Sequence, residues 1–335
     1  MADTLYFVIP CYNEEEVLPE TAKRLKEKVA SLREKGKVSG LSRIVFVNDG
    51  SKDRTWEMIC ELHEQDPVFS GICLSRNRGH QNALLAGLMT VRDYADFAVS
   101  MDADLQDDVD AVDEMIDKYY AGKDIVYGVR SARQTDTFFK RTTAHGFYSL
   151  MKGMGAETVA DHADFRLMSA RALDALSGFT EVNLFLRGIV PMLGFPTDVV
   201  YYERHERFAG ESKYPLKKML SFAVQGITSL STKPLQMITG LGFFIFLVSI
   251  LMLVYSLFRH FTGATIVGWT SLTISLWAIG GLILLSLGVI GEYVGKIYLE
   301  SKARPRFIIQ EYLDSEHGYV AGDERRGERN HGAQE

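Results

Sequence analysis

Short apolar runs alternate with longer segments that are apolar on one face only over the first 130 residues. Five runs have the length of buried strands: residues 5–9, 43–47, 71–74, 97–101 and 124–128. Three segments between them repeat apolar residues every three or four positions, as helices do: residues 18–32, 53–62 and 81–91. Strands that alternate with helices predict an α/β fold, in which helices cover a mostly parallel sheet.

Two much longer apolar segments follow. Neither residues 234–258 nor residues 261–291 contain a charged side chain. Each can supply the roughly 20 residues that a helix needs to cross a bilayer. Core helices of a soluble protein rarely stay uncharged for so long, so we expect two membrane spans, at about residues 235–258 and 268–290. The connection between them is short, which predicts a helical hairpin.

Lysine and arginine are concentrated outside this hairpin. The flanking cations are Lys213, Lys217, Lys218 and Lys233 before it, and Lys296, Lys302, Arg304 and Arg306 after it. The connection holds only Arg259 and His260. Because positive charge stays on the cytoplasmic side, we expect both termini and the N-terminal domain in the cytosol. The chain opens on a strand pattern without a signal peptide, so the expected location is the cytoplasmic (inner) membrane, as a multi-pass protein.

The segment before the first span is amphipathic. Its apolar positions recur at helical spacing: Leu216, Met219, Leu220, Ala223, Val224, Ile227 and Leu230. Such a helix can lie in the headgroup plane or pack against the preceding domain. The expected parts are a cytosolic domain (1–213), an amphipathic helix (214–233), two spans (234–292) and a cytosolic C-terminal segment (293–335) that is disordered after Leu313. Gly291 and Gly295 permit close helix contact, and therefore a homo-oligomer.

Composition narrows the class of protein. The chain has 335 residues and a net charge of −6, which is unlike a nucleic-acid-binding protein. About 230 residues precede the spans, enough for one well-cored domain. The three cysteines lack paired spacing and fit reduced thiols in a cytosolic core better than disulfides or zinc ligands.

Polar residues follow each predicted strand. They are Tyr12, Asn13 and Glu14 after the first, Asp49 after the second, Arg76 after the third, Asp102 and Asp104 after the fourth, and Arg130 after the fifth. In such sheets ligands bind outside the carboxyl ends of the strands. Turn formation alone accounts for Gly50 and Ser51, but it does not explain carboxylates, arginines and a tyrosine on one rim.

Two carboxylates one residue apart, Asp102 and Asp104, offer hard oxygen ligands to Mg²⁺ or Mn²⁺. A divalent ion there can stabilise a departing diphosphate. An isolated Asp-x-Asp pair more often caps a helix or faces solvent. Its place among the other rim motifs, upstream of two spans, makes it specific.

The rim suits a sugar nucleotide. Tyr12 can flank a base, Glu14 and Asp49 can accept hydrogen bonds from base or ribose, and Arg130 can face a diphosphate. A dinucleotide oxidoreductase is disfavoured, because no G-x-G-x-x-G follows the first strand, and a P-loop ATPase lacks its G-x-x-x-x-G-K-[ST] motif.

At this point the motifs resemble those of a known family. Residues 8–15, 47–51, 74–77 and 101–106 resemble family 2 glycosyltransferases with the GT-A fold. Residues 164–168 and 207–214, followed by a basic amphipathic segment and two spans, resemble the polyprenyl-phosphate glycosyltransferases. That group includes bactoprenol glucosyltransferases and dolichol-phosphate mannose synthases. The resemblance covers roughly residues 5–306.

The resemblance implies an inverting, metal-dependent transfer of a hexose. The donor would be a nucleotide sugar, commonly UDP-glucose, and the acceptor a membrane polyprenyl phosphate such as undecaprenyl phosphate. The polyprenyl-monophosphate sugar would serve cell-envelope glycan or lipopolysaccharide modification. A phosphate monoester with a second pKa near 6 is largely dianionic at neutral pH, so such a nucleophile needs little help from a general base.

The resemblance also implies site residues. Catalytic roles fall to Asp102, Asp104 and Asp164, and metal ligation to Asp102, Asp104 and Gln106. The nucleotide-sugar residues are Pro10, Tyr12, Asn13, Glu14, Asp49, Arg76, Asp102 and Ala103. The acceptor and diphosphate residues are Arg130, Lys140, Arg141, Arg207 and Lys213. Asp164 has a base-like role in the family but could instead pair with Arg166. We interpret His145 and His162 as structural.

Alternatives remain at this stage. The donor could be another UDP-sugar (N-acetylglucosamine or galactose) or GDP-mannose, and the acceptor another membrane lipid, such as diacylglycerol. A catalytically silent membrane scaffold is the non-enzymatic alternative. Asp107, Asp108 and Val109 stand where the family usually has prolines, which leaves the donor sugar open. No Q-x-x-R-W motif is present, so a processive polymer synthase is disfavoured.

Overall fold

The structure is a computed structural model that describes residues 2–130, 162–182, 185–203, 231–261, 268–315 and 317–320. The chain divides into two compact units. The first holds residues 1–141, 158–213 and 305–335, and the second holds residues 142–157 and 214–304. Several predicted features lie outside the described residues: His145, Lys140, Arg141, Arg207, Lys213 and most of the amphipathic segment 214–233.

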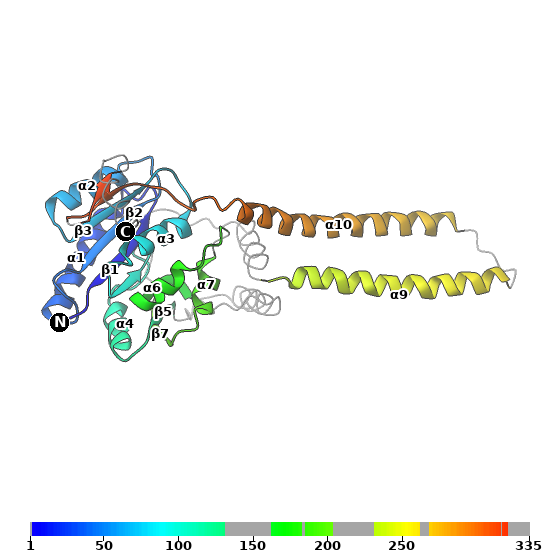
Figure 1. The fold of residues 1–335 in the computed structure, drawn as a ribbon, viewed down its shortest axis with the longest axis horizontal. Coiled ribbons are helices and arrows are strands. Elements are labelled where there is room, and N and C mark those ends of the chain that lie inside the picture. The colour runs from blue at the N-terminus through cyan, green and yellow to red at the C-terminus, as the bar shows by residue number, and fades with distance from the viewer. Residues whose placement is uncertain are drawn as a thin grey trace, which may run out of the picture. The chain divides into compact units, whose positions relative to one another are not determined.

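In the described part of the first unit, nine strands form one sheet, in the order β7-β5-β6-β4-β1-β2-β3-β8-β9. Figure 1 labels β1, β2, β3, β5 and β7 of this sheet. The strands are β1 Leu5–Cys11, β2 Arg43–Asn48, β3 Phe69–Leu74, β4 Phe97–Ser100, β5 Ile125–Arg130, β6 His162–Ser169, β7 Thr197–Tyr202, β8 Ile309–Leu313 and β9 Tyr319–Val320. The central strands β4, β1, β2 and β3 run parallel, as predicted. Because parallel neighbours share their direction, the loops after these strands meet at one rim.

Helices cover both faces of this sheet. They are α1 Leu18–Glu34, α2 Thr55–Gln65, α3 His80–Val91, α4 Ala111–Tyr120, α6 Ala170–Ser177 and α7 Leu186–Met192. Alternate residues of β1 enter different cores: Phe7 and Ile9 pack with α1, α2 and α4, whereas Tyr6 and Val8 pack with α3, α6 and α7. This two-sided burial confirms the predicted covered α/β sheet.

Helix α3 lies unusually close to the sheet. A Cβ at Gly87 would come 2.3 Å from Val8 Cγ1 and 2.8 Å from Val47 Cγ2. The glycine therefore allows the helix backbone to rest directly on β1 and β2. This packing brings the N-terminus of α3, at His80, to the rim where β1 and β2 end.

Strand β6 was not predicted, and it is antiparallel to both β4 and β5. Its sequence, HADFRLMS, carries an aspartate and an arginine that are both buried. Buried charges break the apolar pattern by which strands are identified. The strand places Asp164 and Arg166 directly beside the rim residues of β4.

The second unit contains two long helices, α9 Lys233–Phe261 and α10 Trp269–Ser301. Among the described residues, one helical segment, Ile279–Ser301, is long and apolar enough to cross a membrane. The Tyr293 hydroxyl donates a hydrogen bond to the Ser231 carbonyl at 2.6 Å, so the start of α9 lies beside the end of α10. Helix α10 extends to Ser301, beyond the expected limit at residue 290.

The chain after α10 returns to the sheet of the first unit. We call residues 305–320 the C-terminal strap. Its strand β8 pairs antiparallel with β3, and Arg306 donates to the Phe179 carbonyl at 2.9 Å. The C-terminal strap thus belongs to the first unit and extends its sheet. Tyr319–Val320, which lie in the tail for which the sequence predicts disorder, pair with β8 as strand β9.

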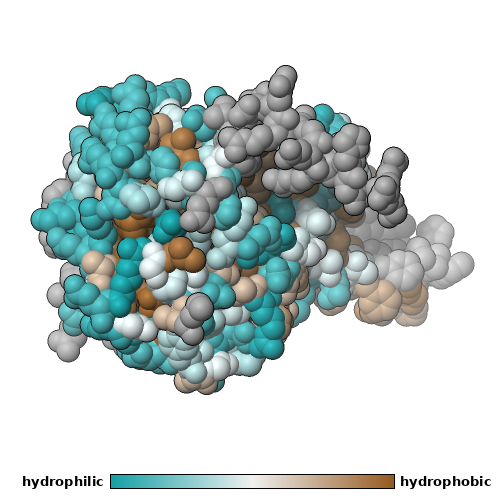
Figure 2. All heavy atoms as spheres, turned by 60° about the vertical axis from the view of Figure 1, so that its left-hand side comes forward, coloured by the Kyte–Doolittle hydropathy of each residue, from teal (hydrophilic) through white to brown (hydrophobic). Residues whose placement is uncertain are grey.

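The surface of the molecule agrees with an aqueous environment for the first unit. The face brought forward in Figure 2 is mostly hydrophilic, with small hydrophobic patches between polar residues. In the second unit, many large apolar side chains of α9 and α10 are exposed, among them Leu251, Phe258, Leu276 and Leu284.

We predict that Tyr312→Ala destabilises the first unit by about 3–5 kcal/mol, because it empties a buried aromatic position. Tyr312 is 2% exposed and packs in the core with α3 and α6. The matched control is Ile308→Ala on the same strap, where the side chain is 50% exposed; it should change stability by less than about 0.5 kcal/mol. Thermal unfolding of the detergent-solubilised protein measures both. Equal shifts for the two variants would contradict the assignment of the strap to the core.

Candidate active site

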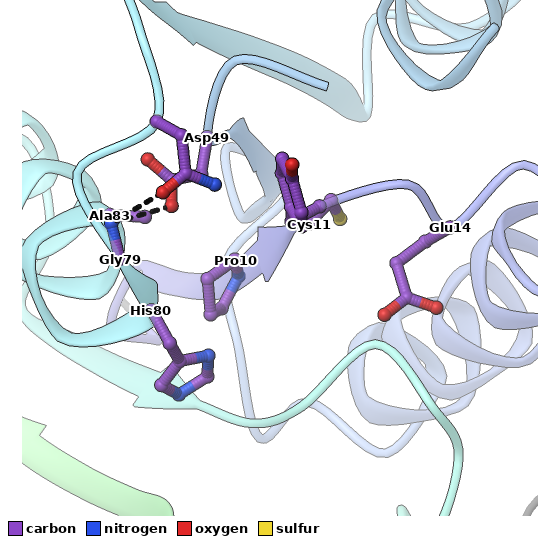
Figure 3. A pocket seen from close by; sticks show the side chains of 9 residues that line it. Pro10, Cys11, Glu14, Asp49, Gly79, His80 and Ala83 are labelled. Carbon is purple, nitrogen blue, oxygen red and sulfur yellow. Dashed lines mark hydrogen bonds between the residues drawn. The ribbon is translucent and has the colours of Figure 1, made fainter. Parts of the chain in front are cut away.

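A pocket of about 240 Å³ opens at the rim where β1 and β2 end and α3 begins. Its lining residues are Pro10, Cys11, Tyr12, Glu14, Asp49, Asn77, Gly79, His80 and Ala83. In Figure 3, Pro10 lies between His80 and Glu14, and Asp49 points at the backbone of Gly79. Tyr12 is 43% exposed, which leaves its ring accessible to a planar ligand.

Asp49 shapes the pocket wall. Its two carboxylate oxygens accept hydrogen bonds from the backbone N–H groups of Arg78, at 2.6 Å, and Gly79, at 2.8 Å. The side chain is nearly fully buried, and this burial raises its pKa despite those hydrogen bonds. Asp49 therefore fixes the loop that leads into α3, whether or not it also contacts a ligand.

The same loop rests against Gly50. This glycine has a φ of +63°, and a Cβ there would lie 2.6 Å from the Asn77 nitrogen and 2.7 Å from the Arg76 carbonyl carbon. Only glycine fits this combination of left-handed backbone and close approach. The turn after β2 and the loop after β3 are thus packed backbone against backbone.

Asn13 joins two loops instead of lining the pocket. It adopts a φ of +54°. Its N–H donates to Ser51 Oγ at 3.0 Å, and its side-chain oxygen accepts from the Lys52 N–H at 2.9 Å. Of the predicted nucleotide-sugar residues, the pocket brings together Pro10, Tyr12, Glu14 and Asp49. It does not include Asn13, Arg76, Asp102 or Ala103.

The loop after β4 carries the predicted metal ligands. Ala103 is buried, and its carbonyl accepts a hydrogen bond from the Thr21 hydroxyl at 2.8 Å. Leu105 has a φ of +56°, and the Gln106 N–H donates to Asp104 Oδ1 at 3.1 Å. Ala103 is therefore an anchor of this loop, while Asp102 and Asp104 flank it.

The surroundings of the Asp102 carboxylate disfavour its negative charge. Its Oδ1 is buried and accepts no hydrogen bond from the described residues, although His80 Nε2 lies 3.3 Å away as a potential ion-pair partner. Burial, together with the charges of Asp107, Asp164 and Asp104, raises its pKa to about 6, although the nearby His80 opposes the shift. A cation beside Asp102 would relieve this penalty, so the carboxylate fits a divalent metal.

A complete metal-ligand set is not assembled in the described part of the chain, where no three His, Cys, Asp or Glu side chains group as metal ligands. A metal at Asp102 and Asp104 would therefore take its remaining ligands from Gln106, water or substrate oxygens. That ligand set stays a prediction.

Asp164 is surrounded by cationic groups. Its Oδ1 lies 2.5 Å from Arg166 Nη2, and its Oδ2 lies 3.1 Å from Arg187 Nη2 and 3.5 Å from His80 Nε2. Burial would raise its pKa, but these partners hold it well below the usual range. An ionised carboxylate with both oxygens engaged is poorly suited to accept a proton, so Asp164 organises cations instead.

His80 and Arg187 were missed as site residues by sequence reasoning. His80 Nε2 lies 3.3 Å from Asp102 Oδ1 and also contacts Asp164. Burial lowers the pKa of His80, but the two carboxylates together raise it to about 8, so it is largely protonated at neutral pH. Arg187 is a single arginine within the apolar stretch of α7, and that isolation is the signal that could have revealed it.

Of the residues predicted to bind the acceptor or the diphosphate, Arg130 is the one that lies within the described part of the chain. It ends β5, and its Nη2 lies 3.2 Å from Asp107 Oδ1, while its Nε donates to the Tyr202 hydroxyl at 3.2 Å. Burial opposes the charge of Arg130, but Asp107 more than compensates and raises its pKa. The other four predicted acceptor residues lie outside the described residues.

Comparison with known proteins shows to which family the chain belongs. The model of Glycosyl transferase family 2 matches residues 6–176. The uncharacterized glycosyltransferase YkoT of Bacillus subtilis is 51% identical over 305 residues, which cover 91% of this chain and 90% of that protein. The chain belongs to glycosyltransferase family 2. It is therefore a nucleotide-sugar glycosyltransferase, and the non-enzymatic scaffold is set aside.

This family 2 enzyme is also similar to a phage protein and, much less closely, to a solved structure. The bactoprenol glucosyl transferase of Shigella phage SfV is 39% identical over 307 residues, which cover 90% of this chain and 97% of that protein. Among solved structures, glucosyl-3-phosphoglycerate synthase from Mycobacterium tuberculosis, crystallised with Mn²⁺, UDP and phosphoglyceric acid, gives a TM-score of 0.42 at 16% identity. That alignment covers 68% of this chain and 77% of the other.

We predict that Gly50→Ala weakens binding of the nucleotide-sugar donor by at least about tenfold, because the added methyl group displaces the loop that carries Asn77 and Gly79. Gly36→Ala is the matched control: its φ is +69°, but a Cβ there would meet nothing within 4 Å. That variant should cost only about 1–2 kcal/mol of stability for the left-handed backbone and leave donor affinity unchanged. Calorimetric titration with UDP-glucose measures the affinity; equal losses in both variants would contradict the role of the Gly50 contact.

Proposed function

We propose that this family 2 enzyme transfers a hexose from a nucleotide sugar, with UDP-glucose as the first candidate, to a membrane polyprenyl phosphate with inversion at the anomeric carbon. The observation that carries this proposal is the 39% identity to a bactoprenol glucosyl transferase over 90% of the chain. That match extends well beyond the family 2 domain at residues 6–176. The proposed product is a polyprenyl-monophosphate sugar for cell-envelope glycan or lipopolysaccharide modification.

The pocket supports a nucleotide-sugar donor. Tyr12 presents an accessible ring for a base, and Glu14 and Asp49 offer carboxylate oxygens near it. His80 lines the same pocket and contacts Asp102. The pocket therefore adjoins Asp102. A nucleotide-sugar donor needs such an arrangement, because its diphosphate is attached directly to its nucleoside.

Asp102 and Asp104, with Gln106, would hold Mg²⁺ or Mn²⁺. Such an ion, when bound, offsets the charge that develops on the departing diphosphate. Asp102 Oδ1 is buried and accepts no hydrogen bond from the described residues, and the pKa of that carboxyl is raised although His80 lies nearby; both observations support this placement. Arg130, at the same rim, adds a fixed positive charge that needs no metal.

The acceptor phosphate supplies its own nucleophilic oxygen. Because Asp164 is held ionised by Arg166 and Arg187, we assign it to orienting these arginines and not to removing a proton. The enzyme's contribution is then alignment of two anionic reactants and neutralisation of their charge. Arg141, Arg207, Lys140 and Lys213 are the further cations that we propose for the acceptor phosphate.

The C-terminal strap supports a two-span topology. It pairs with β3 of the catalytic sheet, so the residues before α9 and after α10 must lie on the same side of any membrane. If α10 crosses the bilayer, an odd number of further crossings has to precede it, and the apolar helix α9 is available for this. We therefore propose a hairpin in the cytoplasmic membrane with the catalytic unit and both termini in the cytosol. The homo-oligomer predicted from Gly291 and Gly295 stays a prediction.

We predict that Asp104→Ala reduces sugar transfer by at least about a hundredfold while the protein still folds, because the metal loses a carboxylate ligand. Membranes containing the variant are given radiolabelled UDP-glucose, UDP-N-acetylglucosamine, UDP-galactose or GDP-mannose, with undecaprenyl phosphate or diacylglycerol as acceptor. Asp108→Ala on the same loop is the control, and it should retain most of the activity. Full activity in Asp104→Ala, or in wild-type membranes treated with EDTA, would reject the metal-dependent mechanism.

The topology is tested with fusions. Alkaline phosphatase fused after Ala264, between the two helices, should be active, because that enzyme folds only outside the cytoplasm. The same reporter fused after Glu335 should be inactive, and a fluorescent protein there should be bright. The reverse pattern at either position would contradict the hairpin.

A further inference from the structure

Three side chains from separate parts of the chain meet at the end of β5. Asp107 comes from the loop after β4, Arg130 is the last residue of β5, and Tyr202 is the last residue of β7. Arg130 and Tyr202 are register partners on neighbouring parallel strands. We call these three residues the Arg130 triad.

Each member of the Arg130 triad contacts the other two. Arg130 Nη2 lies 3.2 Å from Asp107 Oδ1, Arg130 Nε donates to the Tyr202 hydroxyl at 3.2 Å, and that hydroxyl donates to Asp107 Oδ1. Two donors thus converge on one carboxylate oxygen. A planar guanidinium that is held at two of its nitrogens can adopt only one orientation.

Burial differs sharply across the triad. The Asp107 side chain is 1% exposed, whereas the Arg130 side chain is 29% exposed, and Tyr202 is buried. Within the described residues, the guanidinium is therefore the part of the triad that reaches solvent. The buried pair lies behind it and holds it at the rim.

The remaining oxygen of Asp107 makes this arrangement costly. Oδ2 is buried and has no hydrogen-bond partner among the residues that the structure describes. A buried carboxylate that served only to join strands would be expected to satisfy both oxygens, and an apolar contact would join them at lower cost. The charge is more readily explained by what it does to Arg130.

We propose that Asp107 and Tyr202 are positioning residues that hold the Arg130 guanidinium toward the diphosphate of the nucleotide-sugar donor. This inference rests on the proposed function, which supplies the diphosphate. Asp107 and Tyr202 do not touch the substrate in this arrangement. They act through Arg130, so their contribution should disappear when Arg130 is absent.

Tyr202→Phe is the sharpest test, because it removes the hydroxyl and keeps the ring, which packs edge-on against Phe165 with 5.3 Å between ring centroids. Calorimetric titration of the full-length protein with UDP-glucose should show about tenfold weaker binding. The loss should be much smaller with UMP, which lacks the second phosphate. Tyr119→Phe is the matched control: its hydroxyl also donates to an aspartate, Asp3, at 3.0 Å, and its removal should leave binding unchanged.

A double-mutant cycle separates positioning from a structural role. Arg130→Gln alone should weaken UDP-glucose binding by more than Tyr202→Phe, and adding Tyr202→Phe to it should cause little further loss. A multiplicative loss in the double variant, or unchanged binding in Tyr202→Phe, would overturn the inference. Asp107→Asn can replace Tyr202→Phe in the cycle. It should also weaken UDP-glucose binding when Arg130 is present and cause little further loss in Arg130→Gln.

The unmodified protein distinguishes this inference from the proposed function. If the wild-type chain binds UDP-glucose and glycosylates undecaprenyl phosphate, but Tyr202→Phe leaves UDP-glucose affinity unchanged, the inference alone is wrong. If the wild-type chain binds neither UDP-glucose nor UDP, both the proposed donor and the inference are contradicted.

Discussion

The compensation of buried negative charge at one end of a parallel sheet is the constraint on which this site depends. Asp102, Asp107 and Asp164 are brought close enough for each of the latter two to raise the pKa of Asp102. Removing carboxylates from water is costly unless cations or hydrogen bonds replace the solvent. Arg166 and Arg187 do this for Asp164, and Arg130 with Tyr202 does it for one oxygen of Asp107. Asp102 is the member left least compensated.

Backbone packing sets where these charges lie. Gly87 allows α3 to rest on β1 and β2, which brings His80 to the rim, and Gly50 allows the turn after β2 to touch the loop that leads into α3. Asp49 then closes that loop through the N–H groups of Arg78 and Gly79. A site must hold its charged groups within a few tenths of an ångström. Here, backbone contacts at the two glycines and hydrogen bonds to backbone N–H groups set those positions.

Local patterns predicted the central part of the fold well, because β1 to β4 and the helices between them are amphipathic or apolar in the usual periods. Strands β6 and β8 escaped prediction for different reasons. Buried Asp164 and Arg166 disrupt the apolar pattern of β6, and β8 pairs with a strand more than 200 residues earlier, which no local pattern encodes. The same distinction holds for the site. The spacing of Asp102 and Asp104 is visible in the sequence, whereas the link of His80 and Arg187 to the site depends on their tertiary contacts with Asp164.

The charges also bear on how two anionic substrates can share one site. In the reaction that we propose, a donor diphosphate and an acceptor phosphate would repel each other, and the protein's own carboxylates would add to that repulsion. Carboxylates are nevertheless useful there if each fixes a cation that faces the substrates, because a guanidinium held at two nitrogens loses little entropy when it binds phosphate. In this interpretation, the acidic residues of the rim have different roles. Asp164 and Asp107 pair with arginines, while Asp102, which pairs with no arginine in the part of the chain that the structure describes, is the carboxylate that we propose for the metal ion.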